Sequence, residues 1–155
     1  MMRPRLLALL LPTALIGGAL ISQYGFGLYP CEMCHWQRWP HYAAMLVALG
    51  ALMLGQRPGG RAMLWLAILL IATSGAIGLF HAGVEYHWWQ GLTTCTSNGP
   101  MTMDDLLGQP LVRCDVPQWQ IFGISLAGFN AIFSLGGAAL IGWLALREAR
   151  AGRAG

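Results

Sequence analysis

The sequence predicts an all-α membrane protein, a four-transmembrane-helix bundle with two outer-face loops. Apolar residues make up 56% of the 155 residues and charged residues only 10%, against roughly 25% charged residues in an ordinary soluble protein. Four long apolar stretches follow one another, and arginines gather in alternate connections between them. We therefore expect a single integral membrane domain over residues 1–155.

Each apolar stretch predicts a helix that crosses the bilayer. A spanning helix requires about 20 residues, and backbone polar groups in lipid must be paired within the protein, as in helices or closed barrels. The stretches lack the alternation of barrel strands. The expected spans are 6–24, 37–55, 62–81 and 120–146. The first also resembles a signal peptide, but no clear A-x-A cleavage site follows it, and we expect a retained helix.

The distribution of arginine predicts the orientation. The chain has nine arginines and no lysine. Seven lie in the N-terminal segment, the second inter-helix connection and the C-terminal segment: Arg3, Arg5, Arg57, Arg61, Arg147, Arg150 and Arg153. Positive-inside bias makes these segments cytoplasmic, so both termini are expected in the cytoplasm and loops 25–36 and 82–119 on the outer face. The net charge of +3 follows from this topology, and nothing suggests nucleic-acid binding.

The first outer loop contains the segment YPCEMCHWQRWPHY, residues 29–42. Its two cysteines, Cys31 and Cys34, form a C-x-x-C pair whose disulfide closes a very small ring and exchanges through mixed disulfides. Cys34 lies near the expected start of the second helix, and Arg38 follows one turn later. A helix N-terminus and a nearby cation both stabilise a thiolate. Arg38 is also an ionisable residue at the end of a span, which makes it a candidate to bind a membrane-dissolved substrate through a carbonyl oxygen.

Two other interpretations of this segment require different chemistry. CEMCH, ending at His35, has the spacing of a c-type haem attachment site. Zinc could bind Cys31 and Cys34 together with two histidines, drawn from the four in the chain: His35, His41, His81 and His87. Both leave the second cysteine pair, Cys95 and Cys114, without a role. Redox exchange uses all four cysteines, so we favour it and expect no metal.

Cys95 and Cys114 lie in the second outer loop, separated by 18 residues. A structural loop-closing disulfide is the simplest interpretation of such a spacing. On an oxidising face of a membrane, however, cysteines are expected to be bonded or catalytic rather than idle.

The combination of these motifs resembles the DsbB family of disulfide bond formation proteins. The resemblance rests on CEMCHWQR, which ends at Arg38, on the later cysteine pair, and on VPQW, residues 116–119, before the last span. It covers nearly the whole chain. It implies a bacterial inner (cytoplasmic) membrane protein with periplasmic cysteines.

The resemblance also implies an electron path. Cys95 would form a mixed disulfide with a DsbA-like periplasmic thioredoxin-fold oxidase, and Cys114 would then engage Cys31. Cys34 would react as a thiolate with a membrane quinone, ubiquinone or menaquinone, held near Arg38. The DsbA–DsbB–quinone route keeps the bacterial periplasm oxidising. His87 lies roughly where the family can carry a polar histidine near the quinone.

The predicted function is therefore a thiol:quinone oxidoreductase that sustains disulfide formation. A small membrane c-type cytochrome is the alternative, to be recognised by its visible haem spectrum. A metal-binding or scaffold protein would instead hold zinc and have thiols inert to quinone. Vitamin K epoxide reductase-like enzymes share the chemistry, but their C-x-x-C follows the loop pair, whereas here it comes first.

Overall fold

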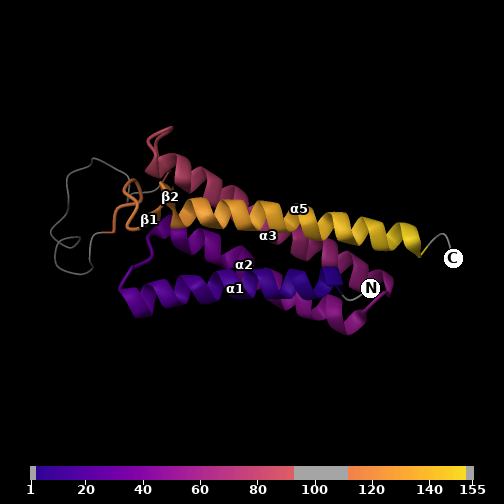
Figure 1. Cartoon of the computed structure of the whole chain (residues 1–155). Coiled ribbons are helices and arrows are strands. Elements are labelled where there is room, and N and C mark those ends of the chain that lie inside the picture. The colour runs from indigo at the N-terminus through magenta and orange to yellow at the C-terminus, as the bar shows by residue number, and fades with distance from the viewer. Residues whose placement is uncertain (1–2, 93–111, 153–155) are drawn as a thin grey trace.

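The computed structural model describes residues 3–92 and 112–152. Within these ranges there are four long helices, and each runs antiparallel to the one before it in the chain (Figure 1). They are α1 (Arg3–Phe26), α2 (Glu32–Leu54), α3 (Pro58–Glu85) and α5 (Leu126–Ala151). The α1–α2 connection, the end of α3 and the start of α5 lie at one end of the bundle. The start of α1, the α2–α3 turn and the end of α5 lie at the other (Figure 1).

Three of these helices, α1, α3 and α5, are long and apolar enough to cross a membrane. The chain is thus a helical multi-pass membrane protein, as predicted, with one short two-stranded ribbon. Helix α2 falls outside this group because its first turns carry polar side chains, among them Glu32, Gln37, Arg38 and His41. The expectation that α2 also spans the bilayer stays a prediction.

Small residues form the centre of the bundle. Ala44, Ala48 and Ala51 recur along one face of α2 and are fully buried against residues of α1, α3 and α5. Side chains this small let helix backbones approach closely. The same effect brings α3 against α5, because a Cβ added at Gly75 would lie 2.8 Å from Leu135 Cγ.

The fourth apolar stretch differs from the expected span 120–146. The helix begins only at Leu126, after a two-stranded ribbon of β1 (Gln120–Ile121) and β2 (Ile124–Ser125). The connecting residues, Phe122 and Gly123, both have positive φ (52° and 76°), as a two-residue hairpin turn of type I′ requires. Ser125 then caps α5 by accepting a hydrogen bond from Gly128 N. Hydropathy alone did not detect this turn chemistry.

The other helices also extend beyond the expected spans. Helix α2 begins at Glu32, five residues before the expected start of the second span, so Cys34 lies in its first turn. Helix α3 continues to Glu85, past the expected boundary at residue 81. These extensions place the C-x-x-C pair and the end of α3 at the same level of the bundle.

Candidate active site

Cys31 and Cys34 are held together by the start of α2. Cys31 is the N-cap residue, and its sulfur accepts a hydrogen bond from Cys34 N at 3.3 Å. The two Sγ atoms are 2.8 Å apart, and both residues are free thiols. Cys31 is buried and Cys34 is half-buried. The pair is therefore positioned to close and open a disulfide without movement of the helix.

The two thiols differ in acidity. The hydrogen bond between them raises the pKa of Cys31, and burial raises it further. The same hydrogen bond lowers the pKa of Cys34, and the positive charge of Arg38 adds to this effect while burial opposes it. Because the thiolate is the reactive form, Cys34 is the better nucleophile of the pair.

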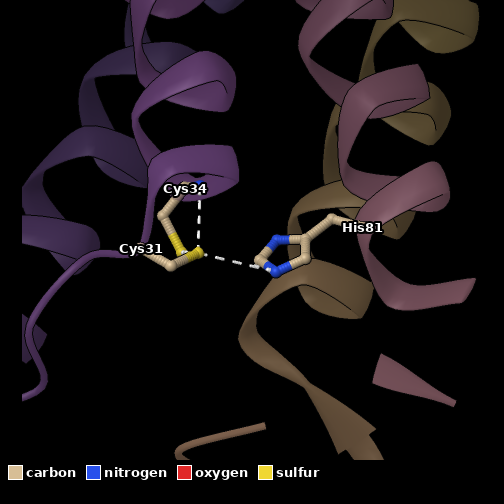
Figure 2. A group of neighbouring side chains, drawn as sticks. All are labelled: Cys31, Cys34 and His81. Atoms are coloured by element: carbon tan, nitrogen blue, oxygen red, sulfur yellow. Dashed lines mark hydrogen bonds between the residues drawn. The ribbon is translucent and has the colours of Figure 1, made fainter. Parts of the chain in front are cut away.

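His81, from the last turns of α3, faces the cysteine pair (Figure 2). Its Nε2 lies 3.6 Å from Cys31 Sγ and 3.9 Å from Glu85 Oε1. Its Nδ1 lies 2.8 Å from Gln37 Nε2, and the backbone of Cys114 lies near the ring. One buried imidazole thus contacts both loops that carry cysteines.

The possible metal ligands in the described part of the chain form a group of three. Ligand atoms of Cys31, Cys34 and His81 lie within 4.8 Å of one another, whereas a structural zinc site usually has four ligands. His35 and His87 are exposed, and His41 lies in a different hydrogen-bond cluster with Asn130. The structure therefore does not bring two histidines to the cysteine pair.

The packing around Cys31 also disfavours haem attachment. Cys31 is 4% exposed and lies in an apolar cluster with Met33, Val84 and Cys114. A porphyrin could reach its sulfur only if this cluster opened. The haem interpretation of CEMCH thus requires a rearrangement that the thiol interpretation does not.

A cavity of about 280 Å³ opens beside Cys34, close to the lower end of the usual size for small-molecule sites, roughly 300–1,000 Å³. Helices α1 and α5 supply most of its apolar walls, through residues such as Leu15, Ala19, Leu126 and Phe133. Polar groups from all four helices also line the cavity. They are Ser22 on α1, Tyr29 in the first loop, Cys31 and Cys34 at the start of α2, Gln37, Arg38 and His41 on α2, His81 and Glu85 on α3, Arg113 and Gln118 before the last helix, and Asn130 on α5.

Arg38 is among the residues that line this cavity. Its Nη1 donates to Gln23 Oε1 at 2.7 Å and its Nη2 donates to the Ala19 carbonyl at 3.3 Å. These bonds tie α2 to α1 and hold the guanidinium beside Cys34. His87, the other predicted quinone contact, is exposed, bonds the Glu85 carbonyl at 3.1 Å and is not among the residues that line the cavity.

Of the second cysteine pair, Cys114 lies within the described residues. Cys114 is disulfide-bonded, fully buried and in the same apolar cluster as Cys31. Cys95 lies outside the described residues. Gln118 donates to the Tyr29 carbonyl at 2.7 Å, so the segment that follows Cys114 is tied to the first loop.

Sequence reasoning considered His41 and His81 only as possible zinc ligands and missed the network of buried and half-buried polar side chains behind the cysteines to which they belong. Its members are Gln37 and His41 on α2, Ser74 and His81 on α3, and Asn130 and Ser134 on α5. A signal was present, because polar residues inside an apolar span are expensive and are functional candidates by default. Two of the three pairs are four residues apart, which places each of those pairs on one helix face.

Comparison with known proteins agrees with this site. The family model for disulfide bond formation protein DsbB matches residues 2–144. Disulfide bond formation protein B of Chromohalobacter salexigens is 32% identical over 138 residues, covering 87% of this chain and 74% of that protein. The protein of the same name from Actinobacillus pleuropneumoniae is 30% identical over 126 residues, covering 73% and 68%.

An uncharacterised protein of Rickettsia prowazekii is 27% identical over 125 residues, covering 76% of this chain and 72% of that protein. No solved structure matches significantly. The family match spans the cysteine pair, Arg38 and all four helices up to residue 144. The chain therefore belongs to the DsbB family of disulfide bond formation proteins.

Proposed function

We propose that this disulfide-forming membrane oxidoreductase is a thiol:quinone oxidoreductase. It passes electrons from a DsbA-like periplasmic thioredoxin-fold oxidase through Cys95 and Cys114, then through Cys31 and Cys34, to membrane quinone. The observation that carries the proposal is that the acidic thiol Cys34 and the cation Arg38 line the same largely apolar cavity.

The residues around the cavity fit a quinone. Its apolar walls on α1 and α5 suit a lipid-soluble ring, and the Arg38 guanidinium supplies donors for a carbonyl oxygen. His41 also lines the cavity, and its buried Nδ1 has no hydrogen-bond partner among the described residues. A bound quinone would supply the electron sink, taking up two electrons and two protons to leave as quinol.

The thiol steps follow from exchange chemistry. A partner thiolate attacks the Cys95–Cys114 disulfide at Cys95, which forms a mixed disulfide and releases Cys114. The Cys114 thiolate attacks Cys31 in the Cys31–Cys34 disulfide, and Cys34 leaves as a thiolate. The second partner thiol then attacks the mixed disulfide, so the partner is oxidised and released with Cys95 reduced.

The cycle closes when Cys95 attacks Cys114 in its bond to Cys31. This attack re-forms the Cys95–Cys114 disulfide and leaves Cys31 and Cys34 reduced. Burial of Cys114 in the same cluster as Cys31 supports transfer between the loops. The dithiol then delivers two electrons at the cavity, where Arg38 favours the Cys34 thiolate.

The arrangement of charge supports an inner-membrane location with periplasmic cysteines and cytoplasmic termini. Arg5 lies near the start of α1, Arg57 just before α3 and Arg147 near the end of α5. These helix ends lie at the end of the bundle opposite the start of α2, which carries the cysteine pair (Figure 1). Positive-inside bias makes that end cytoplasmic.

The test is a thiol count on reduced protein under anaerobic conditions, before and after addition of a soluble ubiquinone analogue. Quinone is expected to lower the number of alkylatable cysteines, and Cys34→Ser is expected to abolish this loss. Cys114→Ser is the matched control, because it leaves oxidation of Cys31 and Cys34 by quinone intact while stopping oxidation of a reduced DsbA-like partner. If all thiols of the wild-type protein stay alkylatable, the quinone step is wrong.

A further inference from the structure

A hydrogen-bond chain runs from the half-buried Asn130 on α5 to the buried surroundings of the cysteine pair. Asn130 Nδ2 donates to Gln37 Oε1 at 2.8 Å, and Gln37 Nε2 lies 2.8 Å from His81 Nδ1. His81 Nε2 in turn lies 3.6 Å from Cys31 Sγ. Gln37 and His81 are 7% and 2% exposed, so water competes little for these bonds.

Backbone carbonyls determine the direction of the chain. A carbonyl oxygen can only accept a hydrogen bond. Gln37 Nε2 donates to the Met33 carbonyl and Asn130 Nδ2 donates to the Ser74 carbonyl, both at 3.2 Å. These contacts assign the nitrogen and oxygen of each amide independently of the histidine. Gln37 therefore presents its N–H to His81 Nδ1 and its oxygen to Asn130.

This direction specifies the tautomer of His81. In a neutral imidazole one nitrogen donates and the other accepts. Because Nδ1 accepts from Gln37, the proton is on Nε2, which faces Cys31 Sγ at 3.6 Å and Glu85 Oε1 at 3.9 Å. Both neighbours can accept a hydrogen bond, and Glu85 is itself bonded by Ser125 Oγ. The environment of Nε2 is thus consistent with an N–H.

We propose that Asn130 is a positioning residue that acts through Gln37 to hold His81 with its N–H toward Cys31. The effect of this positioning on catalysis rests on the proposed thiol:quinone function. When the bond from Cys31 to Cys114 breaks, the electron pair passes to the Cys31 sulfur. The His81 N–H stabilises that thiolate while its proton stays on Nε2. With the opposite tautomer a lone pair would face the sulfur and oppose its departure.

Asparagine suits this role because it both donates and accepts. Its Nδ2 serves Gln37 and Ser74, while its Oδ1 accepts from Ser134 Oγ at 2.9 Å and lies 3.0 Å from His41 Nε2. Close packing of α3 on α5 makes these contacts possible, since a Cβ added at Gly78 would lie 2.9 Å from Asn130 Nδ2. Leucine has the same number and branching of side-chain heavy atoms as asparagine, and it removes every polar contact.

The tautomer is measured directly by nitrogen NMR of ¹⁵N-histidine-labelled, reduced protein in detergent, with the His81 signals assigned by His81→Asn. The wild type is expected to carry its proton on Nε2. Asn130→Leu is expected to raise the Nδ1–H population about fivefold, the factor for one lost neutral hydrogen bond. Ser134→Ala, the control, removes a different bond to Asn130 and is expected to keep the wild-type tautomer.

Reactivity of Cys31 gives a second readout. In a Cys34→Ala background, Asn130→Leu is expected to slow alkylation of Cys31 at constant pH about fivefold, and Gln37→Met to slow it at least as much. Wild-type protein with the proton on Nδ1, or Asn130→Leu with an unchanged tautomer, would overturn the proposal. Neither measurement uses quinone or partner, so failure here is distinguishable from failure of the oxidoreductase function.

Discussion

Replacement of Arg38 by methionine tests the link between the cavity and the thiols. Arg38 is half-buried, bonds Gln23 and the Ala19 carbonyl on α1, and lines the cavity with Cys34. Methionine keeps most of the aliphatic stem and removes the charge with all its donors. Two losses follow: a charge-assisted hydrogen bond to the substrate oxygen, and one of the influences that lower the pKa of Cys34.

The magnitude follows from the hydrogen bond that Arg38 is proposed to make. A hydrogen bond to a charged group contributes roughly 1.5–3 kcal/mol, and each 1.4 kcal/mol corresponds to about a factor of ten. We therefore expect kcat/KM for quinone to fall roughly 10- to 150-fold in Arg38→Met. Arg38→Lys is expected to fall between this variant and the wild type, because it keeps the charge but not the planar fork of donors.

The assay follows the absorbance of a soluble quinone analogue mixed with reduced protein. Arg147→Met is the matched control, because its guanidinium lies 3.9 Å from the centre of the Trp143 ring, toward the other end of α5. Thermal melting in detergent would show whether loss of the α1–α2 contacts lowers stability instead. A kcat/KM within twofold of the wild type in Arg38→Met, or an equal loss in Arg147→Met, would refute the reasoning.

Two further predictions concern thiol acidity and helix packing. Cys31→Ala is expected to raise the pKa of Cys34, because the S–H donor that lowers it is lost. Alkylation of Cys34 should then require a higher pH. Cys31→Ser keeps a donor and should therefore raise the pKa of Cys34 by less. Gly75→Ala is expected to destabilise the protein by about 1–3 kcal/mol, because its Cβ would lie 3.0 Å from Leu135 N. Gly136→Ala, with open space at its Cβ, should melt like the wild type. An equal loss in both glycine variants would contradict the packing argument.

Much of the fold was predictable from local properties of the chain. Apolar runs about as long as a bilayer is thick predicted α1, α3 and α5, because unpaired backbone groups are too costly in lipid. The spacing of Cys31, Cys34 and Arg38 predicted a thiol pair with a cation one turn away, since these three residues lie within seven positions of the same helix start. Such relations need no knowledge of other helices.

The start of α5 shows where local hydropathy is insufficient. Residues 120–125 are largely apolar and read as part of a span, yet they form a hairpin. Tyr86 stabilises it from the end of α3, where its hydroxyl donates to the Gly123 carbonyl at 2.8 Å and accepts from Ser125 N at 3.0 Å. This pairing joins residues 37 and 39 positions apart, so the sequence window around either partner does not reveal it.

The sequence by itself determined the class of the protein and its apolar helices, and it predicted thiol exchange at its cysteine pair, because each depends on composition or on spacing within a few turns. Only the tertiary structure decided which distant side chains meet that pair. It placed His81 rather than His87 beside Cys31, and brought Asn130 to Gln37 from 93 positions away. The physical reason is that hydrogen bonds act over about 3 Å, a proximity that close packing of α2, α3 and α5 creates and spacing along the chain cannot encode.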